Sequence, residues 1–369
     1  MSYLLLVFLS LLMVTASAAE RWKINYYFDK PDSAFEMRGI QFPSDQRGFV
    51  FGVINSTKER EKAVMLITSN GGAKWTEIPL KENPVALSCI DDSQCWLATE
   101  KGIWKTEESG RDWKKLKKQD GLSAIHFISA KEGYACGYPK AVWKTTDGGL
   151  TWVALPAAKA LESNPETSSY DVIAQHEKNL IIVGTSRPKR MDGGLFPDWM
   201  EPERASRRRQ WPSLSLMLDS RNRGESWTAS SASLFGRIQG MVLGDNIGVL
   251  LLTFEESFEV ASEVLQVDYI TSKTATIYRD KNRTISSVYM DQKGMSTIGG
   301  TETIGSFRAN PTPSKVHILR AQLSKSQTAI WEEMPVDYRA VAHRVIVTGS
   351  PSGKLWAATD AGMILEWKN

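Results

Sequence analysis

Four short segments of this 369-residue chain share one eight-position pattern, and that repeat constrains the fold more than any other feature. The pattern reads Ser or Thr, any residue, Asp, Asn or Glu, any residue, Gly, two further residues and Trp; it covers residues 68–75, 106–113, 145–152 and 220–227. Trp75, Trp113 and Trp152 follow one another at intervals of 38 and 39 residues. Self-similarity at this interval indicates small repeated units, as in solenoids and propellers, which cannot bury an apolar face alone.

The repeated segment has the chemistry of a tight turn. An Asp or Asn at position three can accept hydrogen bonds from turn amides, and a Gly at position five can adopt positive φ without a Cβ penalty. The Trp at position eight can pack against its own unit. We therefore interpret the motif as a structural fastener of the C–D turn. Glu108 departs from the motif because its side chain is longer than that of Asp or Asn. The residues in these three roles are Asn70, Gly72, Trp75, Glu108, Gly110, Trp113, Asp147, Gly149, Trp152, Asn222, Gly224 and Trp227.

Each unit is expected to hold four short antiparallel strands, labelled A to D. In the first unit these are residues 40–42, 48–52 and 64–67, followed by the turn motif and a strand that begins at Trp75. Six units follow this order with declining clarity, and a seventh, near residues 344–367, has only three strands. Residues 21–27 carry a Trp near their start, as the D strands do, and can supply the fourth. The sequence thus predicts an all-β, seven-bladed β-propeller of four-stranded antiparallel blades, closed by the N-terminal strand.

The first nineteen residues have the pattern of a secretory signal peptide. An apolar run from Leu4 to Val14 precedes small residues at 16–19 and the charged pair Glu20–Arg21. An uncleaved anchor is the alternative, although the run is shorter than the ~20 residues of a spanning helix. We expect residues 20–369 to form one exported domain, periplasmic or extracellular, or lumenal to thylakoids in a photosynthetic host.

The charge and the cysteine and histidine content limit which ligands and cofactors the chain is expected to bind. With 45 basic and 42 acidic residues, the formal net charge of +3 does not favour nucleic acid as a ligand. Cys89 and Cys95 flank a polar turn, so they form either a cross-hairpin disulfide or two buried thiols, and Cys136 is left over. The four histidines are scattered without ligand spacing. We expect no metal site, no cofactor and no catalytic cysteine.

At these motifs the chain resembles known proteins. The turn motif resembles the Asp-box, or BNR, repeat, and the fuller pattern of residues 40–152 resembles the photosystem II stability/assembly factor family of exported seven-bladed propellers. The resemblance weakens over 153–230 and afterwards rests on the count of units. It implies a non-enzymatic activity, namely binding a membrane-protein partner during assembly through basic residues on the propeller surface.

The most distinctive surface segment is an insertion at 186–213 in the fourth blade. Long connections between strands B and C also fall at 53–63, 254–263 and 301–315, and loops that elaborate one face are typical of a binding surface. The insertion mixes basic and aromatic side chains that could grip a partner, or it is a solvated loop. Its candidate binding residues are Arg187, Lys189, Arg190, Trp199, Arg204, Arg207, Arg208, Arg209 and Trp211.

Two other functions stay open. Sialidases and some endoglucanases also carry Asp-box propellers, but they need acid/base carboxylates, and sialidases a Tyr nucleophile, for which no local constellation stands out. An envelope protein that recognises glycans or peptides would use the same loop-rich face. We expect a non-enzymatic scaffold that binds a protein partner as a monomer, because a closed ring is stable alone.

Overall fold

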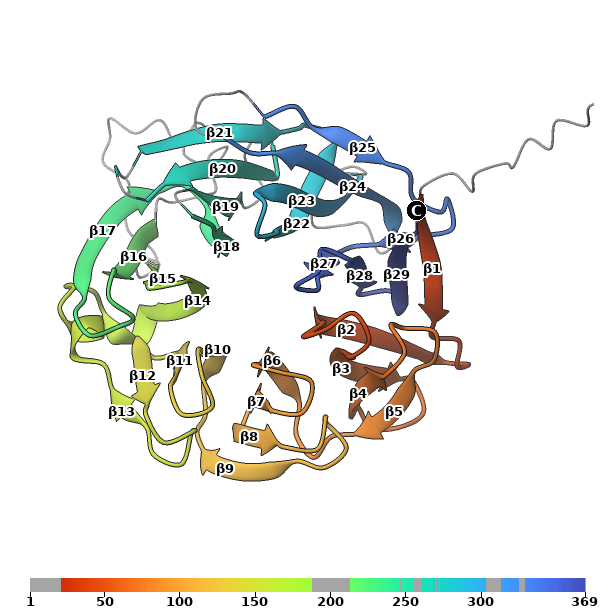
Figure 1. Ribbon diagram of the computed structural model, residues 1–369, viewed down its shortest axis with the longest axis horizontal. Coiled ribbons are helices and arrows are strands. Elements are labelled where there is room, and N and C mark those ends of the chain that lie inside the picture. The colour runs from red at the N-terminus through yellow and green to blue at the C-terminus, as the bar shows by residue number, and fades with distance from the viewer. Residues whose placement is uncertain are drawn as a thin grey trace, which may run out of the picture.

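The computed structural model describes residues 21–187, 213–245, 247–254, 260–269, 271, 273–302, 313–324 and 329–368. Seven sheets stand around a central axis as the blades of a ring (Figure 1). Blade one is β2 to β5, and the blades follow in chain order to blade seven, which is β27, β28, β29 and β1. The predicted seven-bladed propeller of four-stranded antiparallel blades is confirmed.

Within each blade the A strand is innermost and the B strand is its neighbour (Figure 1). The A strands are β2 (Ser33–Gln41), β6 (Pro84–Cys89), β10 (Leu122–Phe127), β14 (Ser168–His176), β18 (Arg237–Leu243), β22 (Arg283–Met290) and β27 (Val345–Gly349). The B strands are β3 (Gly48–Ser56), β7 (Cys95–Thr99), β11 (Gly133–Gly137), β15 (Asn179–Ser186), β19 (Gly248–Thr253), β23 (Met295–Glu302) and β28 (Leu355–Thr359).

The C and D strands complete each blade outward. The C strands are β4 (Lys62–Thr68), β8 (Gly102–Thr106), β12 (Ala141–Thr145), β16 (Ser213–Ser220), β20 (Ser262–Asp268), β24 (Ser314–Gln322) and β29 (Met363–Lys368). The D strands are β5 (Thr76–Pro79), β9 (Lys114–Lys118), β13 (Val153–Ala154), β17 (Thr228–Leu234), β21 (Lys273–Arg279), β25 (Glu332–Met334) and β1 (Arg21–Tyr27). The remaining elements are β26 (Val341–Ala342), which pairs with β24, and the 3-10 helices η1 (Pro156–Lys159) and η2 (Pro165–Thr167).

The ring closes where the sequence predicts. Strand β1 pairs antiparallel with β29, from Arg21 opposite Lys368 to Tyr27 opposite Met363. The Asn25 amide also donates to the Glu366 carboxylate at 2.6 Å. This pairing joins the two ends of the described chain and removes the free edge of β29. No helix within the described residues has the length and apolarity to cross a membrane.

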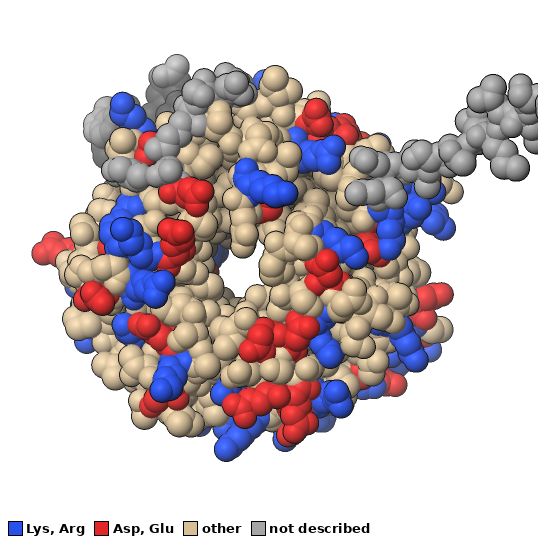
Figure 2. Space-filling view, in the orientation of Figure 1, with Lys and Arg blue, Asp and Glu red and all other residues tan. Residues whose placement is uncertain are grey.

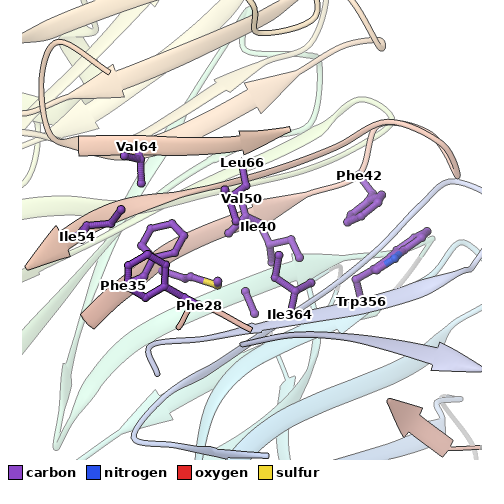
Figure 3. Close-up of a cluster of buried hydrophobic side chains, with 12 residues drawn as sticks. Phe28, Phe35, Ile40, Phe42, Val50, Ile54, Val64, Leu66, Trp356 and Ile364 are labelled. Carbon is purple, nitrogen blue, oxygen red and sulfur yellow. The ribbon is translucent and has the colours of Figure 1, made fainter. Parts of the chain in front are cut away.

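The hydrophobic core lies between neighbouring blades. Buried side chains of the described residues fall into seven clusters, each drawing on two adjacent blades. At the junction of blades seven and one, Trp356 stacks on Phe42 with 3.7 Å between ring centroids and 5° between planes (Figure 3). Because each blade buries both faces against its neighbours, no single blade has a complete core.

One expected connection is shorter than the sequence indicates. The sequence predicts a link between strands B and C of blade one at residues 53–63, but β3 continues to Ser56 and β4 already begins at Lys62. Val53 and Ile54 are buried, so their apolar side chains extend the hairpin. The links predicted in blades four, five and six agree with the strand ends that bound them.

Candidate functional site

The turn motif is held by a side-chain network centred on position one. In blade three the Gly149 amide donates to the Thr145 hydroxyl at 2.9 Å, and that hydroxyl donates to Asp147 at 2.9 Å. Asp147 also accepts from the Thr151 amide at 2.9 Å. The same bonds recur in blades one and four. The expected role of Asp and Asn matches this geometry, whereas sequence reasoning gave no role to the position-one hydroxyl.

Positions four and five both take positive φ. Gly72, Gly110, Gly149 and Gly224 at position five have φ between 80° and 95°. Position four is also left-handed, with Ser109 at 57° and Arg223 at 58°. A non-glycine residue there is strained, and sequence reasoning missed it. In blade two Thr106 still accepts from the Gly110 amide at 3.0 Å, while no hydrogen bond of the Glu108 side chain is found among the described residues.

Two of the four position-eight tryptophans pack against their own blade as expected, and two do not; Trp75 meets Phe42 of its own blade edge to face. Trp152 meets Phe127 of its own blade edge to face, but Trp227 meets Tyr134 of the preceding blade, and Trp113 packs in the cluster between blades one and two. Trp113 is 9% exposed, and the other three are half-buried. They lie between blades because each blade face is covered by its neighbour.

The motif also links blades. Its position-four residue donates to the A–B turn of the same blade, as from the Gly148 amide to Lys131 at 2.8 Å. Its position-four carbonyl accepts from an aromatic side chain on the B strand of the preceding blade: Trp96 to Gly148 at 2.8 Å and Tyr134 to Arg223 at 3.3 Å. These contacts explain the motif as a structural device, and the rim that carries it is called the turn rim.

The opposite rim, called the entry rim, carries the D–A and B–C connections. Asn83, on the link from blade one to blade two, donates there to Glu61 at 2.6 Å and to Glu100 at 3.3 Å. The predicted insertion begins at this rim, where the Arg187 amide donates to the Thr167 carbonyl at 2.9 Å. Arg187 is exposed. The other eight candidate residues, from Lys189 to Trp211, lie outside the described residues, as does the expected signal peptide.

Six of the seven A strands carry a β-bulge at the same level. In each of these A strands, one residue has no partner on the neighbouring B strand. The residues just before and just after it pair with two consecutive B-strand residues. Bulges re-aim side chains and often lie near functional sites. The A strands surround the central opening (Figures 1 and 2), so their six bulges are distributed around it. The bulged residues of this ring are Arg38, Val85, Ser123, Asp171, Gln239 and Ser286.

Three arginines from different blades belong to this ring or lie next to it. Arg237 pairs with Asp171 at 3.1 Å, and its Nε is buried without an acceptor among the described residues. Arg38 lies 3.5 Å from Glu36 and 3.8 Å from Glu100. Arg344 donates to the Met37 carbonyl at 3.3 Å. Each guanidinium is thus positioned by a neighbouring acceptor and has further donors for a ligand.

In four of the six bulged blades, a glycine on the B strand pairs with the residue just before the bulge and makes room for it. A Cβ at Gly52, Gly137, Gly184 or Gly300 would lie 1.8 to 2.2 Å from a carbonyl oxygen two residues before the bulged position. Only a glycine allows so close an approach in these four blades, whereas Thr99 and Leu252 occupy the equivalent position in the bulged blades two and five. Gly52 and Gly137 end the Gly-aromatic-x-x-Gly pattern, so the sequence carries a signal for the bulge in blades one and three.

Cysteines and histidines have clear structural roles. A disulfide joins Cys89 and Cys95, and burial raises the pKa of the free Cys136 thiol well above its usual range. His317 is buried with Glu302 and Glu333 within 2.9 and 2.6 Å of its ring nitrogens, and burial lowers the pKa of His126. His317 is thus enclosed by the fold, and His126 is half-buried.

One group among the described residues could hold a metal ion. Ligand atoms of His176, Glu177 and Asp245 lie within 4.8 Å of one another. His176 Nε2 already lies 2.8 Å from Asp245 Oδ1, and both carboxylates are exposed, so an ion pair accounts for the arrangement. The expectation of no metal site stays a prediction.

Comparison with known proteins gives a match in fold. No protein-family model and no curated protein matches the chain. The structure of YCF48 bound to D1 peptide matches with a TM-score of 0.60 at 14% identity, over 96% of this chain and 97% of that one. YCF48 from Cyanidioschyzon merolae matches with a TM-score of 0.57 at 13% identity, over 94% and 98%. The WD40 β-propeller domain of Doa1 matches with a TM-score of 0.55 at 9% identity, over 95% and 97%.

These likenesses establish the class of protein and no more. The chain is a seven-bladed β-propeller, similar in fold over 94 to 96% of its length to YCF48 and to a WD40 propeller. Because a propeller fold hosts many functions, its activity has to be argued from the site.

Proposed function

We propose that this protein is a non-enzymatic scaffold that binds a segment of a protein partner at the entry-rim end of its central opening. The observation that carries the proposal is the ring of A-strand bulges, which brings Arg38, Asp171 and Gln239 from three blades to one level, with Arg237 and Arg344 beside them. Guanidinium and amide groups arranged in this way suit the carbonyls and carboxylates of a polypeptide.

The comparisons support this choice among propeller functions. One of the solved YCF48 structures is described as bound to D1 peptide, so a propeller of this shape can bind a protein segment. We extend the analogy to the partner class: a membrane or envelope protein that the propeller accompanies during its assembly. Photosynthetic assembly is one form of that function.

We also propose that the protein is exported and that it does not hydrolyse glycosides. The apolar run from Leu4 to Val14 and the Cys89–Cys95 disulfide both fit an oxidising compartment outside the cytosol. At the ring, Asp171 pairs with Arg237 and accepts a hydrogen bond from the Ser169 hydroxyl at 2.8 Å. These contacts suit a positioning role more than general acid/base catalysis. A panel of chromogenic glycosides should give no turnover, and turnover abolished by Asp171→Asn would contradict the proposal.

The direct test is partner capture. The full chain would be cross-linked in its native host, and the captured protein would be identified by mass spectrometry. Arg38→Ala, Arg237→Ala and Arg344→Ala should together abolish its capture. Arg279→Ala is the matched control, because Arg279 lies on outer strand β21 and pairs only with Glu263 among the described residues. Capture that survives the triple substitution would contradict the proposed site.

A further inference from the structure

The outer strand of blade two is unusually basic. Strand β9 has the sequence Lys-Lys-Leu-Lys-Lys and is the edge strand of its sheet. Lys115 is engaged with Glu82 at 2.5 Å. Lys114, Lys117 and Lys118 are exposed and form no ion pair with any described residue. Three positive charges therefore face solvent along one short strand.

Protection of a sheet edge does not explain this concentration. Lysines on edge strands do prevent sheets from joining edge to edge. If protection were the reason, the longest exposed outer strands would need it most. Strand β17, with the sequence Thr-Ala-Ser-Ser-Ala-Ser-Leu, is two residues longer than β9 and carries no charge. The lysines of β9 thus exceed what edge protection requires in this protein.

A groove lies between blades one and two, on one face of the basic strand, whereas Lys114 and Lys117, paired with Lys105 and Ile103, lie on the other face, toward blade three. It has a volume of about 70 Å³; Ile78, Leu80, Trp104 and Trp113 form its apolar wall, and the charged residues Lys81, Glu82, Arg111 and Asp112 line the rest. Lys81 and Lys115 each lie 5.5 Å from the Trp104 ring centroid, and Glu82 accepts from the Trp104 indole at 2.9 Å. The tryptophans are therefore fixed in place, and the groove has room for about one small apolar side chain.

We propose that an acidic, extended segment of a protein partner docks along β9, with carboxylates on Lys114, Lys117 and Lys118 and an apolar side chain in the groove. Charge complementarity and the adjoining apolar groove together favour a polypeptide over a purely anionic surface, which would use only the lysines. This contact rests on the proposed function in that the partner is a protein, but it lies on the outer circumference, away from the central opening. It would give the partner a second attachment, so that both contacts reinforce each other.

A defined peptide tests the docking surface without knowledge of the partner. The probe is a fluorescein-labelled, end-blocked octapeptide in which Glu alternates with Leu and Val, and its anisotropy is measured against the full chain at low and physiological salt. The chain has 13 Trp, so the signal is placed on the peptide. The probe should bind, and binding should weaken with salt because exposed charges are screened over about 8 to 10 Å. The same peptide with Lys in place of Glu should not bind.

Two variants locate the contact. Lys114→Glu, Lys117→Glu and Lys118→Glu together should weaken binding on the order of tenfold or more, as expected when like charges face one another. The matched control changes three other exposed lysines, Lys159, Lys273 and Lys293, to Glu and should leave the affinity within about twofold. Ile78→Glu, which brings a negative charge to the groove, should weaken binding while the lysines stay intact. All variants are checked for an unchanged unfolding midpoint.

Other outcomes would overturn the inference. Equal loss in the control triple would mean that net charge alone attracts the peptide. Binding to phosphatidylglycerol vesicles but not to the peptide would assign the strand to a membrane. If partner capture depends on the arginines of the central ring and is untouched by the β9 triple variant, the docking inference fails while the proposed function stands.

Discussion

Replacement of Gly184 by alanine tests the packing that shapes the central ring. A Cβ at this position would lie 2.2 Å from the Ser169 carbonyl oxygen and 2.8 Å from Tyr170 Cδ1. An ordinary carbon–oxygen contact is about 3.3 to 3.6 Å, so β14 or β15 has to move by roughly 1 Å. Overpacking of this kind costs about 1–3 kcal/mol, against a gain of about 0.4–1 kcal/mol from the less flexible unfolded chain. We expect a net loss of about 1 kcal/mol.

Gly240→Ala is the matched control for this prediction. Gly240 also lies in a strand of the ring, but the nearest atom to its added Cβ is Val288 Cγ2 at 3.7 Å, an ordinary contact. This substitution should be neutral or stabilise the fold by about 0.5 kcal/mol. Urea unfolding, followed by circular dichroism, measures both. Equal midpoints for the two variants would refute the idea that Gly184 makes room for the bulge at Asp171.

Three further predictions concern the fasteners of the blades. Thr145→Val removes the acceptor of a buried turn amide and should cost about 1–2 kcal/mol in urea unfolding, whereas no loss would show that the hydroxyl is dispensable. Reduction of the Cys89–Cys95 disulfide, whose cysteines are 6 positions apart, should lower stability by about 2 kcal/mol, and a Cys89→Ser, Cys95→Ser variant should be insensitive to the reductant. Hydrogen bonds from the Thr151 hydroxyl and amide lower the pKa of Asp147 from 3.8 to about 2. Because the folded pKa lies below the unfolded one, its stabilisation is present above pH 3.8 and is lost as the pH falls towards 2, so urea midpoints should fall less steeply over that range for Asp147→Asn.

The architecture could be predicted because the same turn motif recurs along the sequence. Gly72, Gly149 and Gly224 occupy backbone conformations that other residues avoid, so the motif fixes where each C–D turn lies. The Trp at position 22 identified the N-terminal strand as an outer strand, and strand counting then required ring closure. Local chemistry and spacing were sufficient for both results.

The candidate site could not be predicted in the same way, because it depends on register. A bulge such as that at Asp171 appears only when the partner strand is known, and the arginines of the ring come from positions 38, 237 and 344 in different blades. Packing between blades could not be predicted either, because contacts such as that of Trp227 with Tyr134 cross a blade junction that no local pattern specifies. Such contacts follow from the closed ring rather than from any one repeat.

Photo-cross-linking at the ring tests the central claim most directly. A photo-reactive residue would be placed at Gln239, an exposed bulge position, and in parallel at Lys131, which is exposed on the turn rim. In the native host, the account predicts one discrete protein adduct from position 239, lost when Arg38 and Arg344 are changed to Ala, and none from position 131. The same adducts from both positions, or no protein adduct from position 239, would contradict the claim that the entry-rim end of the opening binds a protein partner.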